Sequence, residues 1–150
     1  MALLDLAELN IGGANMSATA YSLLGFVTWT LLLLIWMEIL RTYLVLSGHV
    51  PANGFAPDNA GLSPFLQRLA RAHANCIEGL PVFGGLMALA MMSSRASITD
   101  PLAYWLLGAR LVQSAIHLTS TSPTAVKARF SAFAVQMAIG LYWAIKLLAS

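Results

Sequence analysis

An otherwise apolar stretch carries polar side chains of types that can bind a ligand: Arg68, Arg71, His73, Asn75 and Glu78. On a helix of about 3.6 residues per turn, four of them fall within an arc of about 80°, and only His73 points elsewhere. Two guanidinium forks suit carboxylates, and a carboxylate beside them suits an ammonium group. This polar stripe predicts a small zwitterionic ligand with more than one carboxylate. An internal Arg–Glu pair that satisfies itself is the alternative. Cys76 lies off the stripe, so it is not predicted to be a nucleophile.

The composition indicates a membrane protein. Of the 150 residues, 59% are hydrophobic and 9% are charged, whereas soluble domains carry about 25% charged residues. The net charge of +2, without a basic run, gives no sign of nucleic-acid binding. The single cysteine excludes an internal disulfide and a cysteine-based metal site, and we expect no metal. The lead-in, Met1–Ser17, is predicted to be loose or a short interfacial helix. It contains no Lys or Arg and so lacks the basic region of a signal peptide.

Four long apolar segments must position these side chains. Each is long enough for a transmembrane helix, which needs about 20 residues, and they cover about residues 19–46, 64–92, 102–121 and 124–148. Ser63-Pro64 and Ser122-Pro123 each have the pattern of an N-cap followed by the first helical residue. Pro81 predicts a kink within the second segment. The predicted architecture is a single all-α membrane domain over residues 1–150, a bundle of four transmembrane helices.

Two further polar groups lie within these segments. Glu38 and Arg41 are close on one face of the first helix and can pair, which requires that this face point inward. In the third helix, Arg110, Gln113 and His117 share an arc of about 100°. An arginine near mid-membrane is costly unless it is paired or hydrated. We therefore predict that Arg110 extends the polar pocket, with an ion pair to Glu78 or Glu38 that holds the helices together as the alternative.

The basic residues gather at one end of the predicted bundle: Arg41, Arg68, Arg71, Lys127 and Arg129. Only Arg95 and Lys146 lie toward the opposite end. Because basic residues favour the cytoplasmic side of a membrane, this distribution places the loop at 48–62 in the cytoplasm and both termini outside. The predicted ligand site then faces the cytoplasm, in the inner membrane if the source is a bacterium.

The polar stripe belongs to a longer signature. Arg68-x-x-Arg71-Ala-His73-x-Asn75-x-x-Glu78-x-x-Pro81-x-Phe83 resembles the MAPEG family, the membrane-associated proteins in eicosanoid and glutathione metabolism. Ala109-Arg110 with His117-Leu118-Thr119, and also Arg129-Phe-Ser-Ala-Phe, resemble the corresponding parts of microsomal glutathione transferases. The resemblance covers the second to fourth helices and is compatible with the first.

The resemblance implies a homotrimer of four-helix subunits that binds glutathione between neighbouring subunits, near the cytoplasmic face. It carries the glutathione contacts over to Arg68, Arg71, Asn75, Glu78, Arg110, Gln113 and His117. Arg129 matches the arginine that stabilises the thiolate, while Glu38, Arg41 and His73 are candidates for supporting roles. Glutathione, the implied co-substrate, has two carboxylates and one ammonium group, which fit the polar stripe. Its thiolate would attack a lipophilic electrophile or a lipid hydroperoxide arriving from the bilayer.

Three departures from the family pattern leave alternatives open. Gln113 or His117 stands where relatives place a tyrosine, and the loop between the first two helices has no Lys or Arg. The turn before the last helix is longer, which makes Lys127 a rival to Arg129. The leading prediction is a membrane glutathione transferase or peroxidase. The alternatives are a non-catalytic trimeric lipid- or thiol-binding protein and a purely structural bundle with internal Arg–Glu pairs.

Overall fold

Helices make up nearly all of the chain that the computed structural model describes, residues 16–149. Its elements are α1 (Ala18–Leu46), α2 (Pro64–Gly79), the π-helical turn η1 (Leu80–Gly84), α3 (Gly85–Met92), α4 (Ala96–Thr119) and α5 (Pro123–Leu148). The prediction of an all-α protein is confirmed. The lead-in predicted at Met1–Ser17 lies outside the described residues, apart from its last two.

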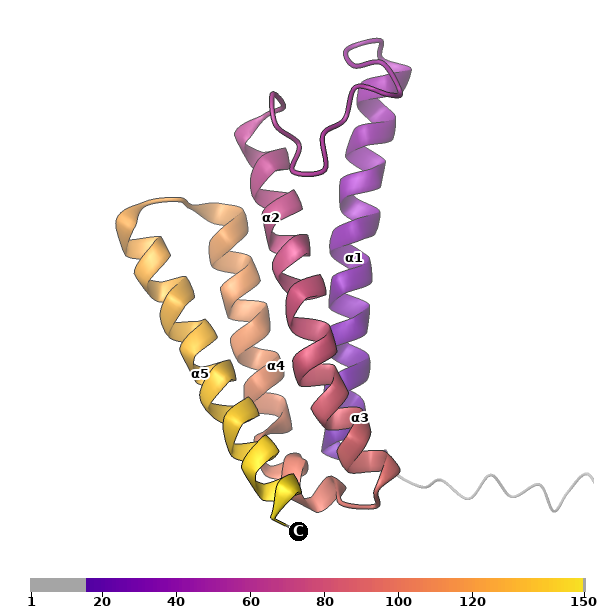
Figure 1. The fold of residues 1–150 in the computed structure, drawn as a ribbon. Coiled ribbons are helices and arrows are strands. Elements are labelled where there is room, and N and C mark those ends of the chain that lie inside the picture. Colours follow the sequence, from indigo (N-terminus) through magenta and orange to yellow (C-terminus); the bar gives the residue numbers. More distant parts are fainter. Residues whose placement is uncertain (1–15, 150) are drawn as a thin grey trace, which may run out of the picture.

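The helices run alternately up and down. Figure 1 shows α2, η1 and α3 following one another as one long rod beside α1, with α4 and α5 on the other side of the bundle. α1 packs against α2 and α4, and α4 packs against α5. The loop at 47–63 and the turn between α4 and α5 lie at the same end of the molecule (Figure 1). The start of α2, the end of α4 and the start of α5 therefore meet at that end.

Two helices begin where the sequence predicts. The Oγ atoms of Ser63 and Ser122 each accept a hydrogen bond from a backbone N–H in the first turn that follows, at 3.3 and 3.2 Å. Pro64 and Pro123 take the first helical position, where an N–H group would have no partner within the helix. These contacts confirm both predicted starts.

The third predicted helix, at 102–121, begins earlier than expected. α4 starts at Ala96, so Pro101 lies inside the helix and the turn before it is shorter. A proline at this position removes one backbone hydrogen bond. Tertiary contacts offset that loss, because Asp100 Oδ1 accepts hydrogen bonds from the backbone N (2.8 Å) and the Oγ1 (2.6 Å) of Thr19. These bonds tie the start of α4 to the start of α1, which local sequence patterns do not reveal.

The disturbance predicted at Pro81 takes the form of one π-helical turn, η1, between α2 and α3. A proline has no N–H group to donate to the carbonyl of the preceding turn. The wider π turn inserts a residue and so changes which side chains face inward after it. Phe83 and Gly84 of this turn are both buried. The turn thus directs Phe83 toward the middle of the bundle.

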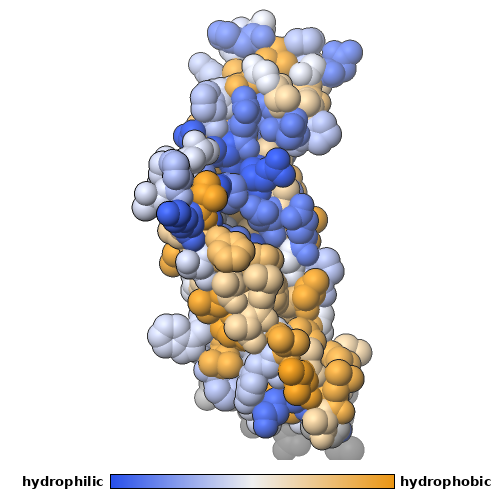
Figure 2. All heavy atoms as spheres, turned by 60° about the vertical axis from the view of Figure 1, so that its left-hand side comes forward, coloured by the Kyte–Doolittle hydropathy of each residue, from blue (hydrophilic) through white to orange (hydrophobic). Residues whose placement is uncertain are grey.

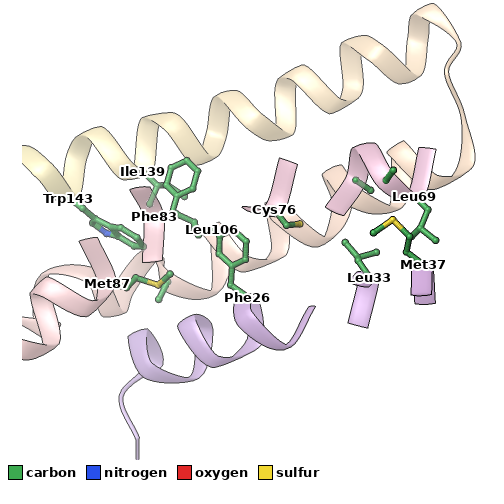
Figure 3. Close-up of a cluster of buried hydrophobic side chains, with 13 residues drawn as sticks. Phe26, Leu33, Met37, Leu69, Cys76, Phe83, Met87, Leu106, Ile139 and Trp143 are labelled. Atoms are coloured by element: carbon green, nitrogen blue, oxygen red, sulfur yellow. The ribbon is translucent and has the colours of Figure 1, made fainter. Parts of the chain in front are cut away.

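The hydrophobic core runs along the inside of the bundle. Phe26 from α1, Met87 from α3, Leu106 from α4 and Trp143 from α5 are fully buried. Figure 3 shows these side chains between the helices, together with Cys76, which lies off the polar stripe as predicted. Because lipid tails are as apolar as such residues, packing contacts hold membrane helices together more than exclusion from water does.

Three helices in the described part of the chain are long and apolar enough to cross a membrane: α1, the run Pro64–Met92, and α5. α4 is not among them, and it carries the buried Arg110. Large apolar side chains such as Leu31 on α1 and Leu141 on α5 are exposed on the outside of the bundle. The prediction of four membrane spans is thus supported for three of its helices.

Candidate functional site

Two neighbouring cavities lie along α2. One, the cationic cavity, measures about 620 Å³, and its walls include Pro57, Asp58, Arg68, Arg71, His117 and Arg129. The other, the apolar cavity, measures about 760 Å³; its polar end is formed by Asn75, Glu78, Arg110 and Gln113, and its remaining walls include Val82, Leu86, Leu89, Met137 and Leu141. On the face that carries α5, Figure 2 shows hydrophilic residues toward the loop end and hydrophobic residues toward the other end. The single polar pocket that the sequence predicts is therefore divided between two neighbouring cavities.

Three guanidinium groups line the cationic cavity. Arg68 and Arg71 come from successive turns of α2, and Arg129 comes from the second turn of α5. Arg68 Nε donates a hydrogen bond to the carbonyl of Leu118 (2.9 Å), which fixes this side chain against the end of α4. Guanidinium groups gathered around one space repel one another and attract anionic groups, and each can bind a carboxylate with two hydrogen bonds. The cavity is therefore suited to a ligand with several negative charges.

Arg129 is held in place by His117. Its Nη1 atom lies 2.5 Å from Nδ1 and 3.0 Å from Nε2 of the imidazole ring. This close contact places the Arg129 guanidinium against the imidazole ring of His117 at the wall of the cationic cavity.

Arg110 lies at the polar end of the apolar cavity and is only 1% exposed. Its guanidinium carbon lies 5.0 Å from the ring centre of Phe26 and 5.8 Å from that of Phe83. Its Nη1 donates a hydrogen bond to the carbonyl of Asn75 (3.1 Å). The one salt bridge within residues 16–149 joins two residues of α1 and does not involve Arg110. Aromatic faces and a carbonyl, not the acidic residue considered from the sequence, surround this charge.

Gly79 makes room for Arg110. A Cβ atom at position 79 would overlap Nη2 of the guanidinium. Nε and Nη2 of Arg110 are buried without a hydrogen-bond partner in the described part of the chain. Buried donors normally have a partner, because an unsatisfied one costs about 1–3 kcal/mol. The aromatic faces of Phe26 and Phe83 beside the guanidinium offset part of this cost.

Four residues named from the sequence lie away from both cavities. Glu38 and Arg41 form the predicted ion pair at 3.1 Å, but Arg41 also donates to Asn59 in the loop, at 2.9 and 2.6 Å from Nε and Nη2. His73 is half-buried in α2, and Lys127 is exposed on α5. Of the two rival cations of α5, the arginine lines the cationic cavity and the lysine does not.

Sequence reasoning missed three residues that shape the site. Asp58 lines the cationic cavity, and the buried Asn59 anchors the loop that carries it. Gln136, fully buried in α5, donates through Nε2 to Oε1 of Gln113 (3.0 Å) and joins α5 to α4. A glutamine inside an apolar helix signals an inward position. A loop has no such periodicity, so nothing in the sequence pattern pointed to Asp58 or Asn59.

A comparison with family models gave a match to the MAPEG family over residues 19–149. The chain belongs to the MAPEG family. The resemblance drawn from the signature of α2 is thereby confirmed. Comparisons with curated proteins and with solved structures gave no match. Membership and the three apolar helices together make this MAPEG protein an integral membrane protein.

The two cavities of this MAPEG protein differ in their linings, with arginines around one and mostly apolar side chains around the other. Ala74 lines the cationic cavity and the next residue, Asn75, lines the apolar one, so the two cavities are neighbours along α2. Between residues 16 and 149, no group of His, Cys, Asp and Glu side chains is arranged to hold a metal ion. What the side chains offer is charge, hydrogen bonds and an apolar surface.

Proposed function

We propose that this MAPEG protein is a membrane glutathione transferase or peroxidase. The observation that carries the proposal is a cavity lined by three guanidinium groups with an apolar cavity next to it along α2. Glutathione has two carboxylates, one ammonium group and a thiol, and its negative groups are complementary to the first cavity. A lipophilic electrophile or a lipid hydroperoxide is complementary to the second. Holding both reactants in adjoining cavities raises their effective concentration.

The chemistry begins with loss of the thiol proton. A cation near the sulfur favours the thiolate, and Arg129, positioned by His117, is the group we assign to this role. In conjugation, the sulfur lone pair forms a bond to the electrophilic carbon, and the leaving group departs with its bonding electrons or an opened ring oxygen takes up a proton. With a hydroperoxide, the sulfur attacks the terminal oxygen and the O–O bond breaks, which gives a sulfenic acid on glutathione and an alkoxide that takes up a proton to become an alcohol. A second glutathione then converts the oxidised sulfur to a disulfide and water.

The proposal includes the assembly and its orientation. We assign α4 as the fourth membrane span, because its 24 residues, at about 1.5 Å each, are long enough for a hydrocarbon core of about 30 Å. A homotrimer would let a neighbouring subunit cover the open side of the two cavities. The loop at 47–63 and the glutathione site would face the cytoplasm, because the basic residues gather at that end.

Thiolate formation tests the proposal. Glutathione is added to the detergent-purified full chain, and the ultraviolet difference spectrum of the thiolate is recorded. We expect a thiolate band in the wild type and about a tenfold smaller thiolate fraction in Arg129→Ala, equivalent to about 1.4 kcal/mol. Lys127→Ala is the matched control, because this cation lies on the same helix but away from the cavity. It should keep the band.

Other results would change the conclusion. Glutathione binding without any thiolate band would support the alternative, a non-catalytic trimeric lipid- or thiol-binding protein. Loss of the band in Lys127→Ala alone would give the lysine the role assigned to Arg129. Arg71→Ala should weaken glutathione binding, because this guanidinium lines the cationic cavity. Unchanged binding in that variant would contradict the position of the site.

A further inference from the structure

The loop between α1 and α2 is fastened to both helices by one residue, Asn59. Its Oδ1 accepts hydrogen bonds from Nε and Nη2 of Arg41 on α1, at 2.9 and 2.6 Å. Its Nδ2 donates to the carbonyl of Leu66 on α2, at 2.9 Å. Arg41 Nη2 also donates a hydrogen bond to the carbonyl of Ala56 (3.3 Å). The guanidinium carbon of Arg41 lies over the ring of Phe55, 5.4 Å from the ring centre. Asn59 is fully buried, so this part of the loop has a defined position.

The hydrogen bonds of Asn59 hold the loop in a position where an acidic residue, Asp58, lines the cationic cavity. Pro57 and Asp58, directly before Asn59, line the cavity together with the arginines of α2. Asp58 Oδ1 accepts a hydrogen bond from the backbone N of Ala60 (3.0 Å), which restricts the orientation of the carboxylate. Asp58 is the acidic residue among those that line this cavity. The loop thus brings one negative charge to a space otherwise surrounded by positive ones.

The charges that line the cavity are opposite in sign and equal in number to those of the glutathione thiolate. Three guanidinium groups and one carboxylate line it, while the thiolate form of glutathione carries three negative groups and one ammonium group. A ligand with negative groups alone would be repelled by Asp58, whereas an ammonium group would gain a charge-assisted hydrogen bond there. The carboxylate therefore adds selectivity that the arginines alone do not provide.

We propose that Asp58 recognises the α-ammonium group of the γ-glutamyl end of glutathione, and that Asn59 and Arg41 position it. This inference rests on the proposed function, because it assigns a ligand group within the same cavity. It makes Asp58 a binding residue that selects amino-bearing thiols over purely anionic ones. It also gives Arg41 a role in positioning the loop, in place of direct contact with the ligand.

The test compares glutathione with its desamino analogue, in which hydrogen replaces the α-amino group. Both ligands are titrated calorimetrically into the full chain in detergent. We expect Asp58→Asn to weaken glutathione binding about tenfold, the effect of losing one hydrogen bond between charged groups. Binding of the desamino analogue should stay the same or become tighter. Asp58→Glu, which keeps the charge, should retain most of the preference for glutathione.

Asn59→Gly tests separately whether the side-chain hydrogen bonds of Asn59 position Asp58. Asn59 has a φ of +57°, a conformation that glycine adopts without strain, so this variant removes the side-chain hydrogen bonds and preserves the backbone. It should lose the preference for glutathione as Asp58→Asn does. Asn53→Ala is the control, because Asn53 is exposed in the same loop and does not line the cavity. It should behave as the wild type.

Several results would overturn the inference. If Asp58→Asn keeps the wild-type ratio of the two affinities, Asp58 does not recognise the ammonium group. If Glu78→Gln removes the ratio while Asp58→Asn keeps it, the ammonium group lies at the other cavity. If Asp58→Asn weakens both ligands equally, its role is structural. A wild-type protein that binds the desamino analogue but not glutathione would also contradict it, whereas binding of neither ligand would overturn the proposed function itself.

Discussion

The buried guanidinium group of Arg110 is stabilised by its contacts with two aromatic rings and a backbone carbonyl, and not by an ion pair with any other described residue. Arg110 contacts the faces of Phe26 and Phe83 and donates to a carbonyl of α2. The negative face of an aromatic ring attracts a cation, and the attraction is stronger where water is excluded. All of these contacts require that α2 present no side chain at position 79. Gly79 is therefore as important to this part of the site as the arginine that it admits.

Gly79→Ala should destabilise the protein. The new methyl group would overlap the guanidinium of Arg110, and relieving such overpacking costs about 1–3 kcal/mol. We expect a lower Tm in detergent, measured by circular dichroism. Gly85→Ala is the matched control in the same helical rod, because a Cβ there meets no atom within 4 Å. The control should be neutral or slightly stabilising, and equal Tm values for the two variants would contradict this account.

At the scale of whole elements, α1 and α4 are joined at their starts by side chains far apart in the sequence. Thr19 Oγ1 lies 2.7 Å from Thr99 Oγ1, and Asp100 accepts two hydrogen bonds from Thr19. One of these bonds comes from a backbone N–H in the first turn of α1, so the carboxylate of α4 acts as a cap for another helix. The cap ties the start of α1 to the residue directly before Pro101 in α4.

Asp100→Ala should remove this cap and lower the free energy of unfolding by about 1–2 kcal/mol. Asp100→Asn keeps the Oδ1 acceptor and loses only the charge near the helix start, which contributes about 0.3–1 kcal/mol. We therefore expect a clearly smaller loss for the asparagine variant, measured as the Tm of the detergent-solubilised protein. Equal losses would mean that charge, and not the acceptor position, accounts for the stabilisation.

The helical periodicity of the sequence predicted which residues share a face of α2, but it did not predict that this face lines two separate cavities. Arg68 and Glu78 lie within one arc, yet at about 1.5 Å per residue they are about 15 Å apart along the helix axis. One face can therefore line two cavities, as it does here. The starts at Ser63 and Ser122 were predictable because a cap depends on neighbouring residues. The partner of Arg41 was not, because Asn59 reaches it only through the course of a loop.

At the scale of the whole molecule, the two ends of the bundle differ in charge. The loop end carries the cationic cavity, while the other end carries Arg95 and Lys146 at the termini of α4 and α5. The exposed apolar surface of α1 and α5 lies between the two ends. This distribution predicts one orientation in the membrane, with the loop at 47–63 in the cytoplasm.

Cysteine labelling in intact cells tests this orientation. Asn53 in the loop and Ser97 at the start of α4 are both exposed, and Cys76 is buried. We expect Ser97→Cys to react with a membrane-impermeant maleimide in intact cells, and Asn53→Cys to react only after the cells are opened. The parent chain, with Cys76 alone, should remain unlabelled. The reverse pattern for the two variants would invert the orientation and place the glutathione site outside.

The environment of Arg110 has a consequence for how the protein enters the membrane during synthesis. A helix carrying this charge gains little from entering hydrocarbon alone, and α4 is not among the apolar helices. The groups that surround the guanidinium, Phe26, Asn75 and Phe83, all belong to segments made before α4. During synthesis, the residues that surround the Arg110 guanidinium are therefore made before Arg110 itself. α4 would enter the bilayer against α1 and α2, and not as an independent span.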